Sequence, residues 1–399
     1  MRTPRAKGRP AKGERPGGAL SGIPPHQLVV GLIEALERRN QNLSKHVNRL
    51  SLGCVGQVGP QGGHIALVSR LASQLSDDVA VRTLNNYCVS GLSAVFDAAL
   101  WLGSGQAGLA LAGGVESLSQ VGFLADKASY YSDPDHIKDL KWAPPIMGAE
   151  LIATREGFSK ADLDALTLTS HRRAHAAWES GFYERSVVPV RGKNGETLIA
   201  RDALIRPDLT AEKLASMPPA FAAQGEMGFD EMMLSEFPDL EKIEHIHSFA
   251  NCPGMADGAS LIALGSKKAG DAAGLKPRAR IIDFIETADD PVLQLTAGFK
   301  AMETLHSRHG LTPNDIDRYE FMEAFAAPPL KFLRDYGVDK NKVNVNGGHL
   351  AMGHPMGATG AILLTSLLCE LEQSKTQTGM VIAQAGGGIG AAIMIERMS

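Results

Sequence analysis

Residues 85–95, Asn-Asn-Tyr-Cys-Val-Ser-Gly-Leu-Ser-Ala-Val, place a cysteine between an expected strand and an expected helix. The strand is the alternating run 79–84, and apolar side chains at helical spacing after Leu92 indicate the helix. Cys88 is therefore predicted to lie in the first turn of a helix, where unpaired backbone N–H groups and the helix dipole favour a thiolate. A buried cysteine that acts as a small apolar side chain fits this position equally well.

The composition limits the classes of protein that the chain can belong to. Its 399 residues suffice for two or three domains, and 44% hydrophobic with 6% aromatic residues is typical of an α/β protein. A net charge of -4 argues against nucleic acid as the main partner. The four cysteines are scattered and form no CxxC pair, so we expect no metal site and a reducing, cytoplasmic location. No run of 18 apolar residues predicts a membrane span.

Strands and helices alternate along both ends of the chain, which is typical of layered α/β architecture. Expected strands include residues 79–84, 108–117, 257–264, 278–284, 316–321 and 342–345, and expected helices include 26–40, 160–180, 293–309, 327–335 and 359–372. The region between them is more charged and less regular. We therefore divide the chain into an N-terminal half (1–118), an inserted, substrate-facing domain (119–250) and a C-terminal half (251–399). The basic start, residues 1–18, is expected to be an exposed loop.

A short internal echo suggests that the two halves are related. Cys88-Val-Ser-Gly-Leu-Ser-Ala and His354-Pro-Met-Gly-Ala-Thr-Gly each place a reactive side chain three residues before a glycine and a predicted helix. A cysteine beside a histidine is the basic unit of thiolate catalysis, because the imidazole takes the thiol proton and the thiolate attacks an acyl carbon. The triplet at Gly386 could supply backbone N–H groups to an oxyanion. A structural histidine and a simple tight turn are the alternatives for His354 and Gly386.

These motifs, in this order, resemble the thiolase family of acetyl-CoA acetyltransferases and 3-ketoacyl-CoA thiolases. The likeness covers nearly the whole chain, at Arg2-Thr3-Pro4, the Cys88 turn, residues 112–117, Met147-Gly148-Ala149-Glu150, Asp257-Gly258-Ala259, Glu323-Ala324-Phe325-Ala326, residues 344–360 and the Gly386 triplet. The resemblance implies a five-layered αβαβα fold of two similar halves with an inserted loop domain. It also implies homodimers or homotetramers, coenzyme A thioesters as substrates, a place in fatty acid metabolism, and no bound cofactor.

The resemblance also implies roles for single residues. Cys88 matches the nucleophile that becomes acylated, and His354 matches the histidine that activates it. The backbone N–H groups of Cys88 and Gly386 match the oxyanion hole. Met147 and Phe325 match positions that line the acyl and pantetheine pocket. Arg206 lies where the family often has a cation for the nucleotide of coenzyme A, although an ordinary surface arginine is an equal alternative.

The sequence departs from the family pattern at three places. Gln384 stands where the family has a second cysteine that acts as acid and base in the carbon–carbon step, and an amide cannot titrate near neutral pH. Met322 replaces an Asn or His that donates a hydrogen bond in the substrate pocket. The family also has a short strand before Arg2, so either that strand is missing or the natural start lies upstream of Met1.

His349 is a candidate substitute for the missing acid/base, unless its side chain points away from the pocket. From these departures we expect acyl transfer to Cys88 to survive and Claisen condensation, or its reverse, to be impaired. Two alternatives stay open. One is an acyl-transfer or hydrolytic variant without carbon–carbon chemistry, and the other is a non-catalytic subunit that binds thioesters beside a partner. Acyl chain length and reaction direction do not follow from the sequence.

Overall fold

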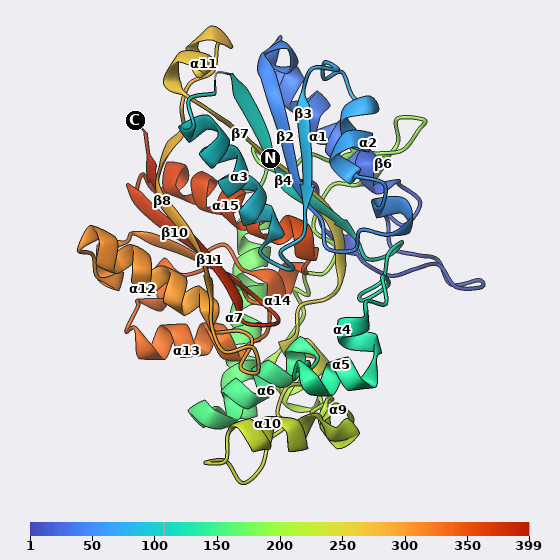
Figure 1. Ribbon diagram of the computed structural model, residues 1–399, viewed down its shortest axis with the longest axis vertical. Coiled ribbons are helices and arrows are strands. Elements are labelled where there is room, and N and C mark those ends of the chain that lie inside the picture. The colour runs from blue at the N-terminus through green and yellow to red at the C-terminus, as the bar shows by residue number, and fades with distance from the viewer. Residues whose placement is uncertain (107, 399) are drawn as a thin grey trace.

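Strand β4 (Leu109–Ser117) runs through the centre of the first of two large sheets in the computed structural model, which describes residues 1–106 and 108–398 (Figure 1). All nine of its residues are buried, as expected for a strand covered on both faces. The five-stranded sheet has the order β1-β7-β4-β2-β3, with bounds Ala6–Lys7, Ala256–Gly265, Leu109–Ser117, Val47–Gly53 and Ala80–Leu84.

The second sheet is built from the C-terminal part of the chain. Its four strands have the order β8-β11-β10-β9, with bounds Ala279–Ala288, Ile389–Arg397, Thr378–Ala385 and Arg318–Phe321. β10 and β11 pair antiparallel on either side of the glycine triplet, and β9 runs parallel to β10. The glycine triplet therefore forms the hairpin turn between the last two strands.

Helices cover both faces of each sheet. Helices α1 (Pro25–Arg39) and α2 (Ile65–Leu71) pack on the outer face of the first sheet, and α12 (Ala297–His309) and α13 (Ala327–Asp335) on the outer face of the second. Between the sheets lie α3 (Ser90–Gly103) and α15 (Met356–Ser374), in a core shared with β4, β10 and β11 (Figure 1). The predicted five-layered αβαβα arrangement is thereby confirmed.

Glycines allow the two central helices to touch near their first turns. A Cβ atom on Gly91 would lie only 2.9 Å from the carbonyl oxygen of Gly357, and one on Gly360 only 2.7 Å from the backbone nitrogen of Leu92. A side chain at these positions would push the helices apart, so the close approach requires glycine. Because α3 follows Cys88 and α15 follows His354, this contact brings the two predicted reactive segments to the same part of the molecule.

One strand joins a different sheet from the one that our division implied. β7 pairs antiparallel with β4 along its whole length, from Leu109 opposite Gly265 to Ser117 opposite Asp257. By strand pairing, residues 256–265 belong with the N-terminal half, although they follow the inserted region in sequence. The residues of a strand do not reveal which sheet it joins. The boundary at 250/251 therefore assigned β7 to the C-terminal half, whereas its pairing places it in the first sheet. The rest of the domain division stays a prediction.

The start of the chain also differs from expectation. Residues 2–6 are buried rather than exposed, and only residues 10–16 form the expected exposed loop. The backbone of Thr3 donates to Ala259 of β7, and Arg2 forms a two-pronged ion pair with Asp202 at 2.7 and 2.8 Å. The basic composition suggested a surface loop because the partner carboxylate lies 200 residues away in sequence.

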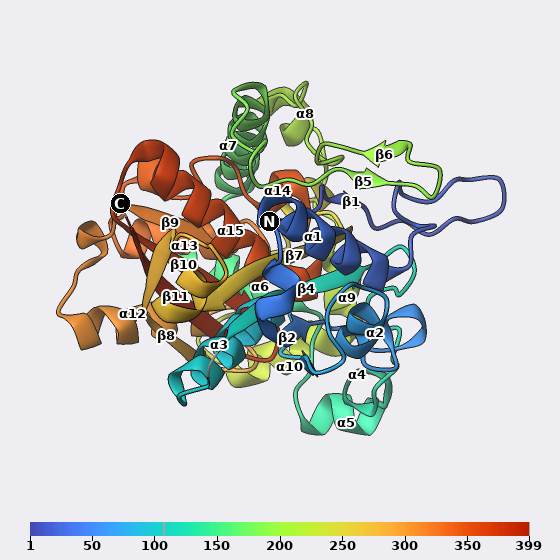
Figure 2. The ribbon, with the colours of Figure 1, turned by 90° about the horizontal axis from the view of Figure 1, so that it is seen from above.

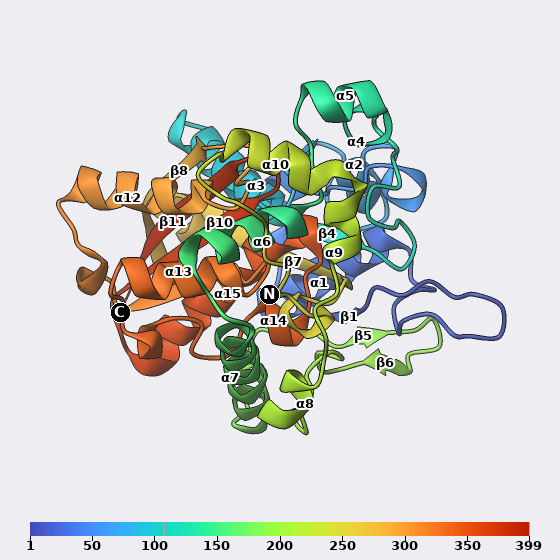
Figure 3. The same cartoon turned by 90° about the horizontal axis from the view of Figure 1, so that it is seen from below.

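The inserted region contributes mostly helices at one end of the molecule. Their bounds are Ser129–Ser132 (α4), Pro134–Asp139 (α5), Pro145–Glu156 (α6), Lys160–Glu179 (α7), Ala211–Ala215 (α8), Ala222–Gln224 (α9) and Asp230–Glu236 (α10). A small hairpin, β5 (Val190–Arg191) and β6 (Thr197–Ile199), projects in the same direction as the loop of residues 10–16 (Figures 2 and 3). The remaining helices are α11 (Lys267–Ala272) and α14 (His349–Met352). No described helix combines the length and apolar character needed to cross a lipid bilayer.

Candidate active site

Cys88 lies in a tight turn between β3 and α3. Tyr87 adopts a left-handed conformation with φ of 47°, and the backbone N–H of Ser90 donates to the carbonyl of Tyr87 at 3.0 Å. Helix α3 begins only at Ser90, so Cys88 precedes the helix by two residues and is not in its first turn as predicted. A non-glycine residue at positive φ is uncommon and costs strain, which the surrounding contacts must hold in place.

The thiol of Cys88 is protonated in this environment. Burial, with a further contribution from the nearby carboxylate of Glu116, raises the pKa of Cys88 to about 12. Desolvation of the charged form thus opposes the thiolate that the nearby helix start favours. The thiol needs a base before it can attack an electrophile.

This leads to a prediction for the pH dependence of alkylation. Because the pKa of Cys88 is raised, the thiolate fraction at pH 7 is smaller than for an ordinary cysteine, and iodoacetamide should modify Cys88 slowly, with a rate that still rises above pH 9. Peptide mass mapping over a pH series measures the rate, and the unfolded protein in denaturant is the control. Fast modification at pH 7 with a plateau below pH 8 would contradict the raised pKa.

Polar contacts from the other half of the molecule hold the Cys88 turn. The side-chain amide of Asn86 donates to Glu286 on β8 at 3.2 Å and to the hydroxyl of Ser93 at 3.0 Å. The backbone N–H of Asn86 donates to Ser90 Oγ at 2.8 Å, and Ser90 Oγ donates to the carbonyl of Tyr87 at 2.6 Å. Sequence reasoning missed Glu286, since only strand pairing in three dimensions brings β8 to this turn.

His354 carries a free acceptor nitrogen. Its Nδ1 lies 2.7 Å from the hydroxyl oxygen of Thr359, its backbone N–H donates to Gly254, and its Nε2 is buried without a hydrogen-bond partner among the described residues. Burial, with the positive charge of Arg5 as a smaller cause, lowers the pKa of His354 to about 4. When Thr359 accepts the Nδ1 proton, the neutral ring presents a lone pair on Nε2 that can take a proton.

Glu116, at the end of β4, connects the segment that follows His354 to the loop after β2. Its fully buried carboxylate accepts backbone N–H groups of Gly357 and Val55 at 3.0 Å and of Gly56 at 3.1 Å, and the amide of Gln61 at 2.6 Å. It thereby ties the first turn of α15 to the loop after β2. The motif of residues 112–117 includes this position, but its residue types do not predict that Glu116 connects α15 to the loop after β2.

Cys88 and the glycine triplet line one pocket. Cys88, Gly386, Gly387 and Met356 lie on its wall, and its open volume is about 680 Å³. His354 is not on the wall but stands two residues before Met356, in the segment that the Gly91 contact holds against α3. The structure thus brings the predicted nucleophile and oxyanion donors to one cavity and places the start of the histidine's helix beside them.

Neither Gln384 nor Met322 is among the residues that line this cavity. Both are fully buried, and the Gln384 amide donates to the backbone carbonyl of Met322 at 3.3 Å. The Gln384 carbonyl oxygen faces α12, where a Cβ on Gly298 would approach it to 2.8 Å, and it has no partner in the described part of the chain. The Met322 side chain packs in the apolar core with α3, so it is not a pocket-lining residue.

His349 packs directly against His354. The two rings lie 5.7 Å apart and nearly perpendicular, and both ring nitrogens of His349 are buried without partners in the described residues. Burial, then the charges of Arg5 and His354, hold the pKa of His349 well below its usual range. The role of His349 as a substitute acid/base stays a prediction.

The remaining predicted residues are spread around the site. Met147 is fully buried in the core of the inserted region, so it does not line the Cys88 pocket, although Pro145 does. Phe325 is half-buried between that core and the central one, edge-on to the ring of His247. Arg206 is exposed; its backbone N–H donates to His171 Nδ1 at 3.1 Å, and its backbone carbonyl accepts from Leu209 at 3.3 Å.

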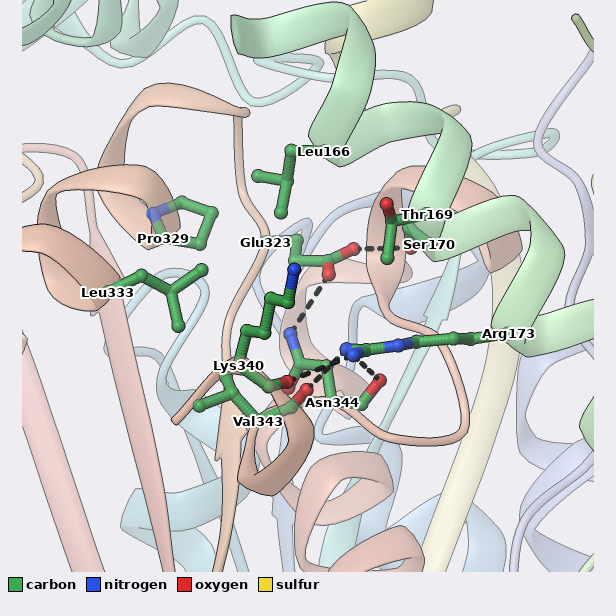
Figure 4. A pocket seen from close by; sticks show the side chains of 10 residues that line it. All are labelled: Leu166, Thr169, Ser170, Arg173, Glu323, Pro329, Leu333, Lys340, Val343 and Asn344. Carbon is green, nitrogen blue, oxygen red and sulfur yellow. Dashed lines mark hydrogen bonds between the residues drawn. The ribbon is translucent and has the colours of Figure 1, made fainter. Parts of the chain in front are cut away.

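A second, separate pocket of about 300 Å³ lies between α7 and the C-terminal half (Figure 4). Glu323 stands in its wall and accepts hydrogen bonds from Ser170 at 2.7 Å, Asn344 at 2.9 Å and the backbone of Leu350 at 3.1 Å. These bonds anchor the segment that leads to His354 onto α7. None of the residues that line this pocket lines the Cys88 pocket, so Glu323 acts on the site only through the segment that leads to His354.

Comparisons with known proteins agree with this geometry. The thiolase N-terminal domain matches residues 7–228 and the thiolase C-terminal domain residues 275–397. The chain is 33% identical to a β-ketoadipyl-CoA thiolase of Pseudomonas putida, over 96% of each chain, and 32% identical to a steroid 3-ketoacyl-CoA thiolase of Mycobacterium tuberculosis, over 98% of this chain and 92% of the relative. It superposes on human mitochondrial 3-ketoacyl-CoA thiolase with a TM-score of 0.86 at 26% identity, covering 100% and 97% of the two chains. The chain belongs to the thiolase family.

Proposed function

We propose that this thiolase-family protein transfers acyl groups from coenzyme A thioesters through an acyl-enzyme on Cys88, nominally as an acetyl-CoA C-acyltransferase. The observation that carries the proposal is that Cys88 and Gly386 line the same pocket. His354 stands two residues before the pocket residue Met356, and its Nε2 is unpaired within the described structure. The family relatives include enzymes named for β-ketoadipyl-CoA, for 3-ketoacyl-CoA and for steroid 3-ketoacyl-CoA, so likeness alone does not choose the acyl group.

In the proposed reaction, the Nε2 atom of His354 accepts the proton of the Cys88 thiol. The thiolate then attacks the thioester carbonyl carbon, and the backbone N–H groups of Cys88 and Gly386 stabilise the oxyanion that forms. When the oxyanion collapses, the carbon–sulfur bond to coenzyme A breaks, and His354 returns its proton to the departing thiolate. The low pKa of His354 keeps its ring neutral at pH 7.

Gln384 and Met322 support the proposal that the carbon–carbon step is impaired. Thiolysis and Claisen condensation need a second acid/base to move a proton at the substrate carbon, and neither an amide nor a thioether titrates near neutral pH. Acyl transfer to the thiol needs only Cys88, His354 and the oxyanion donors, so it is expected to proceed.

Intact mass measurement tests this function. After incubation with acetyl-CoA, the chain should gain one acetyl group on Cys88, while the thiolysis of acetoacetyl-CoA by coenzyme A stays slow. A chain that never gains an acyl group would reject the acyltransferase and favour a thioester-binding subunit. Rapid release of free acid would favour a hydrolytic variant, and fast thiolysis would reject the impaired carbon–carbon step.

A gain-of-function variant tests whether the missing acid/base limits the carbon–carbon step. The double substitution Gln384→Cys with Met322→Asn should raise the thiolysis rate by roughly a hundredfold, which is typical of one positioned acid/base. Gln384→Ser with Met322→Asn is the matched control, because serine has nearly the same shape but does not titrate near neutral pH. Steady-state assays with acetoacetyl-CoA measure the difference. Equal rates for the two double variants would show that the missing thiol is not what limits the reaction.

The assembly state is a further proposal. The family resemblance implies a homodimer or homotetramer, and gel filtration with light scattering measures which one forms.

A further inference from the structure

The wall of the Cys88 pocket opposite the reactive residues is made of aromatic side chains. Residues 122–145 of the inserted region supply Phe123, Tyr130, Tyr131 and Trp142, and Tyr87 adds a fifth ring from the Cys88 turn. The Tyr130 and Tyr131 rings lie 6.2 Å apart, and Tyr131 and Trp142 lie 5.9 Å apart. The rings are tilted against one another and form a continuous apolar surface. This surface is concentrated here although only 6% of the whole chain is aromatic.

The aromatic wall stands close to the reacting atoms. The hydroxyl oxygen of Tyr130 would lie 3.7 Å from a Cβ on Gly387, beside the proposed oxyanion donor, and Tyr87 adjoins Cys88 in sequence. A group attached to a thioester carbonyl at Cys88 must therefore extend past these rings.

The wall carries a negative charge and no positive one among its described residues. Asp126 is the one carboxylate on the wall, and the hydroxyl of Tyr131 donates a hydrogen bond to it. Within the described residues, no lysine, arginine or histidine lines the pocket. A second carboxylate brought here would be repelled by the carboxylate of Asp126, and no cation on the wall would neutralise either group. An uncharged ring would instead stack on the tyrosine and tryptophan faces.

We propose that this pocket selects acyl groups that end in an uncharged ring and rejects acyl groups that end in a carboxylate. The inference deepens the proposed function, on which it rests, by naming the substrate class. Phe123, Tyr131 and Trp142 are its contact residues, and Asp126 is the residue that excludes anionic chains.

Three thioesters with the same number of acyl carbons test the proposal: phenylpropanoyl-CoA, nonanoyl-CoA and nonanedioyl-CoA. Their dissociation constants are measured by calorimetry on the Cys88→Ala variant, which cannot consume them. Phenylpropanoyl-CoA should bind at least about tenfold more tightly than nonanedioyl-CoA, with nonanoyl-CoA between them. Equal affinities for all three, or tightest binding of nonanedioyl-CoA, would overturn the proposal.

Two variants assign the effect to the wall. Asp126→Asn should narrow the gap between phenylpropanoyl-CoA and nonanedioyl-CoA, and Trp142→Ala should remove the preference for the ring over the straight chain. Asp139→Asn is the matched control, because Asp139 lies on the exposed α5 of the same region, outside the pocket, and its loss changes the net charge equally. If Asp139→Asn reduces the difference in affinity between phenylpropanoyl-CoA and nonanedioyl-CoA as much as Asp126→Asn does, the assignment of this effect to Asp126 is overturned.

The same thioesters, offered to the wild-type chain, separate this inference from the proposed function. Discrimination in binding without any acylation of Cys88 would support the pocket and reject the acyl-enzyme. Acylation by all three at equal rates would support the acyl-enzyme and overturn the pocket. If the wild-type chain binds none of the three thioesters, both the pocket preference and the acyl-enzyme are overturned.

Discussion

Replacing Cys88 with alanine should abolish the transfer of acyl groups to the protein, with the rate falling roughly a thousandfold or more. The phenols of Tyr87, Tyr130 and Tyr131 on the described pocket wall cannot replace the sulfur as nucleophiles at neutral pH, because burial raises their pKa values above the usual range. Intact mass after incubation with acetyl-CoA measures the loss. Binding of coenzyme A thioesters should persist, because the pocket wall is unchanged.

Cys252→Ala is the matched control for this experiment. Cys252 is also partly buried and also has a raised pKa, from burial and then from the carboxylate of Glu150, but it does not line the Cys88 pocket. Its loss should leave acylation near the wild-type rate. A Cys88→Ala chain that still becomes acylated, or a Cys252→Ala chain that does not, would move the nucleophile elsewhere. A biological activity that survives Cys88→Ala unchanged would favour the scaffold alternative.

Replacing Asp202 with asparagine should destabilise the fold by about 3–5 kcal/mol, the usual cost of removing one partner of a buried ion pair. The Asp202 carboxylate is fully buried and accepts hydrogen bonds from the Arg2 guanidinium, the Arg5 backbone at 2.8 Å and the Trp178 indole at 3.1 Å. Asparagine keeps the shape but leaves the charges of Arg2 and Arg5 buried without a counter-ion. Urea unfolding followed by circular dichroism measures the loss.

The pH dependence of stability follows from the same carboxylate. Although burial alone would raise its pKa, the charges of Arg2 and Arg5 lower the pKa of Asp202 from 3.8 to about 2. Its stabilisation is therefore fully present above pH 4 and is lost as the pH falls towards 2. The Asp202→Asn variant should lack this acid-dependent loss. Asp208→Asn, which removes an exposed partner of Lys213, should leave stability nearly unchanged. Equal losses for both variants would contradict the role of the buried cluster.

Hydrophobic periodicity predicted the long elements well because their ends carry local signals. Helix α7 was expected at 160–180 and runs from Lys160 to Glu179, where Ser159 and Asp162 form a capping box. Helix α13 was expected at 327–335 and has those bounds. The strand expected at 342–345 is wrong. A single helical turn occupies Lys340–Lys342, and the segment makes one bridge, from Val343 to Tyr319 on the edge strand β9.

The site was harder to predict where it depends on contacts between distant segments. The motifs around Cys88 and Gly386 indicated residues that do line one pocket. Burial of Met147 and Met322 could not be foreseen, because a methionine in a motif looks the same whether it faces a cavity or a core. The left-handed Tyr87 gave no signal either, since tyrosine has no preference for positive φ. Glu116, Glu286 and Glu323 support the site through backbone and cross-sheet bonds that only the folded chain reveals.

The pairing of β4 with β7 has a consequence for synthesis on the ribosome. β4 ends at Ser117, but its antiparallel neighbour begins at Ala256, so the nascent chain must expose a long apolar strand edge while the whole intervening segment is translated. Such an edge can pair with other chains. Production of this protein should therefore respond strongly to slower translation, lower temperature and added chaperones.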